Sequence, residues 1–335
     1  MELEPRDEVE VAVNQARVSH HISIVIPAHN EAASLSETLK ETLQVLSSNS
    51  ISAEVLVVDD GSTDGTWSLI QDFSSRDQRV RGISFSRNFG KERAICAGLE
   101  SSSGQAVVVM DADLQHPPRI IPELIEKWSE GFHVVDGVKR SRGKETWIST
   151  KLAKAFYGLF ALAAGIDLEG QSDFKLLDRR AVEQWKRMPE RTVFFRGMSS
   201  WLGFRRSSVE FDVEDRVAGS SKWSRANLAR LAMSAITSFS SIPLRLVTFT
   251  GLLFFVFAVV LGIQTVYRWA IGEAFTGFPT VILLILITSS LVMLALGIIG
   301  EYLAKIYDEI KGRPRFVIED RCGFDGWSPP ARKLQ

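Results

Sequence analysis

Two carboxylates, one residue apart, follow a strongly apolar run at residues 106–110. These are Asp111 and Asp113, in the sequence Asp111-Ala-Asp113-Leu-Gln115. Because side chains alternate along a strand, both carboxylates are expected on the same side of the backbone. Mg²⁺ is commonly held by one or two carboxylates together with substrate phosphates. The pattern therefore predicts a metal site, at the end of a buried strand, that is suited to a nucleotide diphosphate.

Two further polar clusters follow apolar runs. Pro27-Ala-His-Asn-Glu31 comes after residues 22–26, and a run of aspartates and glycines beginning at Asp59-Asp60 comes after residues 54–58. The glycines of that run permit a tight turn and the close approach of a ligand. The aspartates Asp59 and Asp60 are candidates to accept hydrogen bonds from ribose hydroxyls or a base N–H. Each cluster taken alone is also an ordinary way to begin a helix.

The order of elements favours an α/β fold. Apolar runs that read as strands alternate with segments of helical spacing; the strands are expected at residues 22–26, 54–58, 80–86 and 106–110, and the helices at 31–47, 66–74 and 90–100. This alternation predicts a mostly parallel sheet covered by helices on both faces. Ligands of such sheets bind beyond the carboxyl ends of the strands, where all three polar clusters fall.

Two later segments, residues 246–263 and 278–299, carry no charged side chain. Each is long enough to cross the hydrocarbon core of a bilayer. The connection at residues 264–277 is nearly neutral, whereas basic residues lie outside the pair, including Arg230, Arg245, Lys305 and Lys311. The positive-inside rule then predicts a multi-pass protein of the cytoplasmic (inner) membrane, with two spans and both termini in the cytoplasm.

Charge is unevenly distributed along the chain. The formal net charge of −1 gives no signature of nucleic-acid binding. Residues 216–272 nevertheless contain no Asp or Glu and six Lys or Arg, a composition suited to an anionic membrane surface or a lipid phosphate. Within that stretch, residues 224–241 place apolar side chains on one helical face and predict an amphipathic interfacial helix. The alternative is an ordinary solvated surface helix.

We expect five segments. These are a flexible leader at 1–20 without a signal-peptide core, a catalytic domain at 21–223, the interfacial helix at 224–241, two transmembrane helices within 242–301, and a C-terminal helix and tail at 302–335, with a small strand at 315–318. The two cysteines, Cys96 and Cys322, have neither disulfide-framework nor zinc spacing.

At this point a family resemblance is clear. The motifs at Pro27–Glu31, Asp59–Thr66 and Asp111–Pro118 resemble the inverting family-two glycosyltransferases with the GT-A fold, within the dolichyl-phosphate mannose synthase group. The two apolar segments and the stretch from Arg216 to Trp223 resemble its bacterial branch, the polyisoprenyl-phosphate glycosyltransferases, and most closely the undecaprenyl-phosphate glucosyltransferases. The resemblance covers about residues 20 to 318. It implies a GT-A nucleotide-diphospho-sugar transferase domain followed by an interfacial helix and a transmembrane hairpin.

The resemblance also implies roles for individual residues. On the donor side, the nucleoside would contact Pro27, Glu31 and Asp60, and the metal and diphosphate would be surrounded by Asp111, Asp113 and Gln115. The transferred sugar would lie at Asp173, and the acceptor phosphate would meet Arg140 or Arg142. Near the membrane, phosphates would be covered by Arg216, Ser221 and Lys222. Arginine suits phosphate because its fork donates two parallel hydrogen bonds. Asp173 is expected either to orient a sugar hydroxyl or to take a proton, and His116 is expected to be structural.

The reaction implied is the inverting transfer of a hexose from a sugar nucleotide to a polyprenyl phosphate, with Mg²⁺ or Mn²⁺ as cofactor. UDP-glucose and undecaprenyl phosphate are the first expectations, with GDP-mannose and modified UDP-sugars left open. A phosphate monoester has a second pKa of about 6, so the acceptor needs no strong general base. A homo-oligomer is expected. Two spans form no obvious path for a sugar, so a separate flippase is expected downstream.

Three alternatives remain at this stage. A processive polysaccharide synthase would carry a Gln-x-x-Arg-Trp signature, but here Gln264 and Arg268 have the wrong spacing. A non-catalytic scaffold that senses sugar nucleotides would not need the intact pair Asp111 and Asp113. A transporter subunit would ordinarily carry ionisable residues within its spans, and neither segment has one.

Overall fold

The computed structural model describes residues 21–140, 172–188, 190, 193–211, 242–271 and 278–324. The leader and the interfacial helix expected at 224–241 lie outside the described residues. The chain divides into two compact units. One contains the sheet and the segment that begins at Pro314, and the other contains the two long apolar helices.

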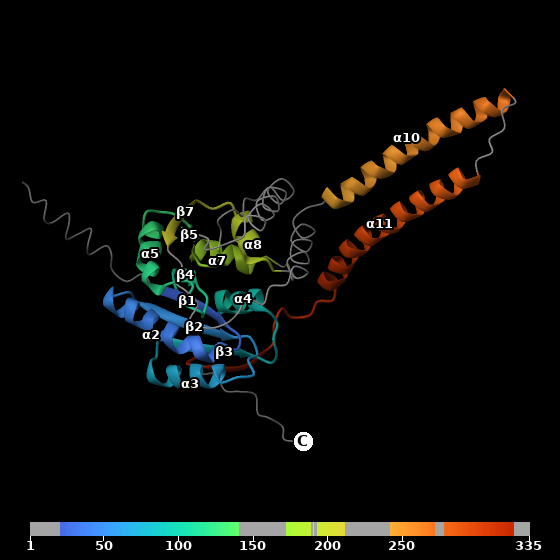
Figure 1. The fold of residues 1–335 in the computed structure, drawn as a ribbon. Coiled ribbons are helices and arrows are strands. Elements are labelled where there is room, and N and C mark those ends of the chain that lie inside the picture. Colours follow the sequence, from blue (N-terminus) through green and yellow to red (C-terminus); the bar gives the residue numbers. More distant parts are fainter. Residues whose placement is uncertain are drawn as a thin grey trace, which may run out of the picture. The chain divides into compact units, whose positions relative to one another are not determined.

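Four parallel strands form the centre of the sheet (Figure 1). They are β1 (Ile22–Ala28), β2 (Ala53–Asp59), β3 (Val80–Phe85) and β4 (Ala106–Val109). Every residue of β1, β2 and β4 is buried, as expected for parallel strands covered on both faces. All four strands were expected from their apolar runs, and the structure confirms them.

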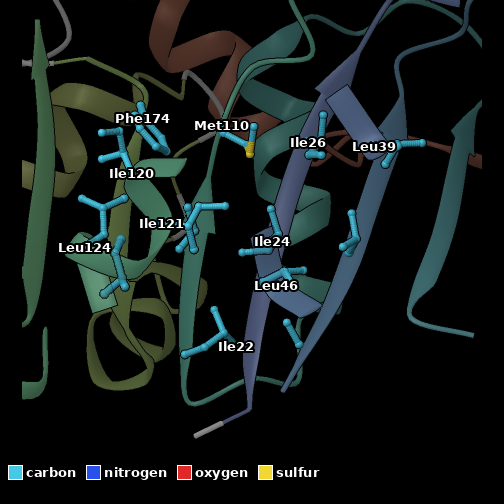
Figure 2. Close-up of a cluster of buried hydrophobic side chains, with 14 of the residues drawn as sticks. Ile22, Ile24, Ile26, Leu39, Leu46, Met110, Ile120, Ile121, Leu124 and Phe174 are labelled. Atoms are coloured by element: carbon cyan, nitrogen blue, oxygen red, sulfur yellow. The ribbon is translucent and has the colours of Figure 1, made fainter. Parts of the chain in front are cut away.

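The helices between these strands cover both faces of the sheet. They are α2 (Ala32–Ser48), α3 (Thr66–Arg76) and α4 (Lys91–Ser101). Leu39 and Leu46 of α2 pack against Ile22, Ile24 and Ile26 of β1 in one buried cluster (Figure 2). Side chains of α4 pack in a second cluster, with Val58 and Ile83. The first cluster, which contains Leu39 and Leu46, also includes side chains of a short 3₁₀ turn, η1 (Pro118–Ile120), and of α5 (Ile121–Ser129).

The sheet has eight strands in the order β7-β5-β6-β4-β1-β2-β3-β8. The added strands are β5 (Val134–Lys139), β6 (Lys175–Asp178), β7 (Arg206–Phe211) and β8 (Ile318–Cys322). Strands β6 and β8 run antiparallel to their neighbours, so the sheet is mostly parallel, as expected. Strands β5, β6 and β7 were not expected from the sequence.

The C-terminal strand β8 belongs to the eight-stranded sheet and not to a separate tail. It pairs antiparallel with β3, with Gly82 opposite Cys322, and lies slightly beyond the small strand expected at 315–318. The ring of Phe316 stacks on Phe85 at a centroid distance of 5.0 Å. Strand β8 thereby covers the edge of β3, which would otherwise present unpaired backbone groups.

The other unit contains α10 (Ile242–Ala270) and α11 (Phe278–Ile310), which contact each other. Each holds a 27-residue stretch of high mean hydropathy, 2.6 and 2.1. Most of their described large apolar side chains are exposed. Within the described residues, these two helices are long and apolar enough to cross a membrane. Helix α11 continues past residue 301 to Ile310, in line with the C-terminal helix that we expected after the second span.

The stacking of Phe316 on Phe85 gives a test of how the last strand is held. We expect Phe316→Ala to cost about 2 kcal/mol of stability, below the range for a fully buried Phe, and to lower Tm by about 4–8 °C. The matched control is Val317→Ala, because Val317 is 44% exposed and its backbone bond to Ser86 would be kept. Thermal denaturation of the detergent-solubilised chain measures both variants, and equal Tm values would contradict the assignment.

Candidate active site

The loops that follow β1, β2, β3 and β4 line one cavity of about 300 Å³. Its described lining comprises Pro27, Ala28, His29, Glu31, Asp60, Asn88, Gly90, Lys91, Asp111 and Asp113. The strand order places β1 between β2 and β4, so the chain reverses its direction of winding beside β1. A ligand site is expected at such a switch point. Five predicted residues, Pro27, Glu31, Asp60, Asp111 and Asp113, therefore lie around one cavity.

His29 belongs to this lining, although we had not singled it out. Its Nδ1 lies 2.8 Å from the backbone oxygen of Asp60. A carbonyl oxygen only accepts, so Nδ1 is the donor in this contact. The neighbouring Glu31 carboxylate accepts a hydrogen bond of 2.6 Å from Ser34 Oγ. Both contacts fix the loop that follows β1.

Asp60 holds the loop between β3 and α4. Its carboxylate accepts hydrogen bonds from the backbone N–H groups of Phe89, at 2.6 Å, and Gly90, at 2.8 Å. Gly90 has φ of +101°, a conformation that glycine adopts without strain. Burial raises the pKa of Asp60 above its ordinary value, against the opposing effect of these two bonds.

Asp59 does not line the cavity. Its side chain accepts hydrogen bonds from Ser62 N at 3.1 Å and from Ser84 Oγ at 2.9 Å, and the residue is 1% exposed. These bonds stabilise the turn after β2. Its predicted contact with the nucleoside stays a prediction.

The antiparallel strand β6 brings Asp173 to the predicted metal site. Lys175 on β6 pairs with Val109 on β4, so Asp173, two residues before Lys175, lies beside Asp111, two residues after Val109. The ammonium of Lys91 lies between the two carboxylates, 2.6 Å from Asp111 Oδ1 and 2.7 Å from Asp173 Oδ2. The sequence indicated both aspartates but not the lysine that joins them.

Arg196, which the sequence did not indicate, also holds Asp173. It lies on the short helix α8 (Phe195–Trp201), and its Nε and Nη2 lie 2.7 and 3.1 Å from the two carboxylate oxygens. Burial alone would raise the pKa of Asp173, but Lys91 and Arg196 outweigh it and hold the pKa well below its usual range. Asp173 is therefore a stable anion and a weak base.

The described residues fit a divalent cation that substrate phosphates help to hold. Asp111 and Asp113 offer hard oxygen ligands to the cavity. No group of three or more His, Cys, Asp or Glu within the described residues could form an all-protein cage. One or two carboxylates completed by phosphates is the usual arrangement for Mg²⁺. Gln115 is outside the described lining, and its N–H donates to Asp113 Oδ1 at 3.2 Å.

His116 supports the loop that carries Asp111 and Asp113. Its Nδ1 accepts a hydrogen bond of 3.2 Å from the backbone N–H of Asp111, so this nitrogen carries no proton. The ring stacks on Phe174 at 5.1 Å. Burial lowers the pKa of His116, which agrees with a neutral ring. These contacts are those of a structural histidine, as the sequence suggested.

Comparison with known proteins decides the family. Residues 23–186 match the family described as Glycosyl transferase family 2. The chain is 38% identical to the uncharacterized glycosyltransferase YkcC of Bacillus subtilis, over 92% of this chain and 97% of that protein. The protein belongs to glycosyltransferase family 2.

Other relatives carry more specific names. The prophage bactoprenol glucosyl transferase homolog of Escherichia coli is 36% identical, over 89% of this chain and 98% of that protein. The bactoprenol glucosyl transferase of Shigella phage SfX is 36% identical, over 90% and 99%. Among solved structures, mannosyl-3-phosphoglycerate synthase from Rubrobacter xylanophilus is 18% identical with a TM-score of 0.48, over 68% of this chain and 75% of that one.

In this glycosyltransferase a buried ionic network supports α8 and hence Arg196. The fully buried Lys175 Nζ lies 2.9 Å from Ser199 Oγ on α8 and 3.1 Å from Asp136 Oδ1 on β5. Arg206 on β7 reaches the other oxygen of Asp136 at 2.6 Å. Buried charges are stable only when paired and hydrogen-bonded. This network therefore ties three strands to the helix that carries Arg196.

Of the residues expected to bind phosphates on the acceptor side, only Arg140 lies within the described residues. This residue follows β5, outside the described lining of the cavity, and its Nε lies 3.4 Å from Glu210 Oε2 in an exposed ion pair. Arg142, Arg216, Ser221 and Lys222 lie outside the described residues. The roles expected for these five residues stay predictions.

Glu92 joins α4 to α8. Its Oε2 accepts a hydrogen bond of 2.8 Å from the backbone N–H of Phe195. Burial, with a smaller contribution from the charge of Asp173, raises the pKa of Glu92 to about 7. The folded protein therefore binds a proton at Glu92 more tightly than the unfolded chain does.

This raised pKa predicts a pH-dependent contribution to stability. A carboxyl whose pKa is higher in the folded state favours folding at low pH, and that contribution is lost as pH rises toward 7. Glu92→Gln keeps an acceptor for Phe195 N–H without the charge. The difference in Tm between this variant and wild type should therefore shift in favour of the variant by about 2–4 °C or more as pH rises from 5 to 8. Thermal denaturation across this range measures it, with Glu37→Gln on the exposed face of α2 as control. Parallel curves for Glu92→Gln and wild type would contradict the assignment.

Proposed function

We propose that this glycosyltransferase transfers glucose from UDP-glucose to a polyprenyl phosphate, undecaprenyl phosphate, with inversion at the anomeric carbon. The observation that carries the proposal is that Asp111, Asp113 and Asp173 meet at one sheet edge, in a chain that also has two helices apolar enough to cross a membrane. The relatives named bactoprenol glucosyl transferase support both the sugar and the lipid acceptor.

For the donor, Pro27, Glu31 and Asp60 are proposed to contact the nucleoside, with Asp59 behind them. Asp111 and Asp113, with Gln115 nearby, would hold Mg²⁺ or Mn²⁺. When bound, the metal neutralises charge on the departing nucleoside diphosphate. The cavity needs such a cation, because its described lining carries four carboxylates, Glu31 among them, and one ammonium.

For the acceptor, the phosphate group is the nucleophile. Its second pKa is about 6, so it is largely dianionic at neutral pH. One phosphate oxygen forms a bond to the anomeric carbon, while the bond from that carbon to the diphosphate oxygen breaks and its electron pair leaves with UDP. No proton has to be removed in this step. Asp173, a weak base, then serves to orient a sugar hydroxyl, and Arg140 or Arg142, with Arg216, Ser221 and Lys222, is proposed to hold phosphates.

For the membrane, we propose that α10 and α11 span the inner membrane with both termini in the cytoplasm. The basic residues that flank the two helices in the sequence support this orientation. The interfacial helix at 224–241 would then keep the catalytic domain at the lipid headgroups. A homo-oligomer, and a separate flippase that consumes the lipid-linked sugar, complete the proposal.

The donor and the metal are tested together. Radiolabelled UDP- and GDP-sugars are offered with undecaprenyl phosphate in detergent, with Mg²⁺, with Mn²⁺ and with EDTA. We expect one lipid-linked sugar, formed from UDP-glucose and abolished by EDTA, and a loss on the order of 100-fold or more in Asp113→Asn, because metal stabilisation of the leaving group is worth several kcal/mol.

The matched control is Asp72→Asn, on the exposed face of α3. Lipid product from no donor would reject the proposed function. Product from another donor alone would reject glucose while keeping the reaction class.

Asp173 is tested by its pH behaviour. Since its pKa is held below the usual range, wild-type activity should fall below about pH 6, where the acceptor takes up its second proton, and Asp173 should add no titration of its own between pH 6 and 9. Asp173→Asn should lower kcat by about 10- to 100-fold and leave this profile in place. Glu183→Gln, exposed on α7 (Arg179–Lys186), serves as control. A profile that changes shape in Asp173→Asn would show instead that Asp173 acts as a base.

A further inference from the structure

Lys91 is the one cation among the described residues that line the cavity, where it faces four carboxylates: Glu31, Asp60, Asp111 and Asp113. It is the first residue of α4 and follows Gly90, whose positive φ turns the chain into the helix. Any anion that enters the cavity meets this ammonium, and any cation that binds Asp111 must share that carboxylate with it.

The two ion pairs of Lys91 differ in how replaceable they are. Asp173 is also bound through both its oxygens by Arg196, at 2.7 and 3.1 Å. Asp111 has Lys91 at 2.6 Å, whereas its other close basic group, His116 at 3.7 Å, is held neutral by the Asp111 N–H. The lysine therefore neutralises Asp111, and Asp173 keeps a counter-charge whether or not Lys91 stays.

Lys91 is also free to move. Its side chain is 41% exposed, so its flexible stem can change rotamer without disturbing the buried core. The carboxylates on both sides raise the pKa of its ammonium, against the effect of burial. Lys91 is therefore charged where it lies between Asp111 and Asp173.

We propose that Lys91 is an internal competitor for the metal ion at Asp111, and that the diphosphate of the donor relieves this competition by accepting the ammonium. The inference rests on the proposed function, which supplies the metal and the diphosphate. A divalent ion alone must displace Lys91 from Asp111 against charge repulsion. With a diphosphate present, the ammonium gains phosphate oxygens as partners and Asp111 is released to the metal.

This competition couples the two ligands. Metal should bind weakly by itself and much more tightly with nucleotide, and linkage requires nucleotide to gain equally from metal. Removing the ammonium should strengthen the binding of metal alone, since Asp111 and Asp173 then face each other uncompensated by Lys91. The same change should weaken the cooperation between metal and nucleotide. If Lys91 only stabilised the fold, its removal would change neither the affinity for metal alone nor the cooperation between metal and nucleotide.

The experiment measures Mn²⁺ affinity by electron paramagnetic resonance, on the full detergent-solubilised chain, with and without UDP. In Lys91→Met we expect Mn²⁺ alone to bind about tenfold more tightly, and the enhancement by UDP to shrink about tenfold or more, a size usual for coupled ligands. Lys91→Arg should keep the enhancement, because the charge remains. Lys127→Met, which removes an ammonium paired with Glu130 on α5, should behave as wild type.

The outcomes separate the two levels of the proposal. If the wild type binds neither Mn²⁺ nor UDP, the proposed function fails. If it binds both, and Lys91→Met shows unchanged affinities and an unchanged enhancement, the competition fails while the function stands. Lys91→Gln is measured in parallel, and Tm is recorded for both variants as a check of folding. The test then remains valid if Lys91→Met does not fold. Weaker binding of Mn²⁺ alone in a folded Gln or Met variant would equally overturn the inference.

Discussion

The arrangement of this active site follows from one constraint, which is that carboxylates brought together at a sheet edge must be compensated by nearby cations. Asp111 follows β4 and Asp173 precedes β6, and the antiparallel register of these strands sets the two side by side. Two unpaired carboxylates so placed would repel each other and one would take up a proton. Lys91 and Arg196 prevent this, so Asp173 remains an anion.

The surrounding structure holds in place the backbone from which those two cations extend. The bonds from Asp60 to the N–H groups of Phe89 and Gly90 fix the loop that leads into Lys91. The network of Lys175, Asp136 and Arg206 fixes α8, which carries Arg196. Such rigid support matters for catalysis by positioning, because small displacements of the groups that contact a substrate are costly. The metal, the diphosphate and the transferred sugar would all bind within this framework.

The catalytic sheet is also built from both ends of the chain. Strand β3 pairs with β8, which comes after the two apolar helices in the sequence. The sheet is complete only once the whole chain has been made, including the segment beyond α11. This connectivity makes the membrane-spanning candidates an internal insertion within one folded domain, rather than an appended anchor.

The elements whose signals are local could be predicted from the sequence. The four central strands are continuous apolar runs, the first three helices have regular apolar spacing, and the two long helices are recognisable by length and hydropathy. Those elements position Pro27, Glu31, Asp60, Asp111 and Asp113, and the motifs were enough to indicate the glycosyltransferase family.

Features that depend on strand register and on pairing between distant residues could not be predicted in this way. Strand β6 is four residues long and begins at Lys175, a buried charge that no apolar pattern predicts. Its partners Asp136 and Ser199 are distant in sequence. The contacts of Lys91 with Asp111 and Asp173 join residues up to 82 positions apart. An unmatched charge in a sequence does not name its partner, because that choice is made by the alignment of strands, and here that alignment assembles the site.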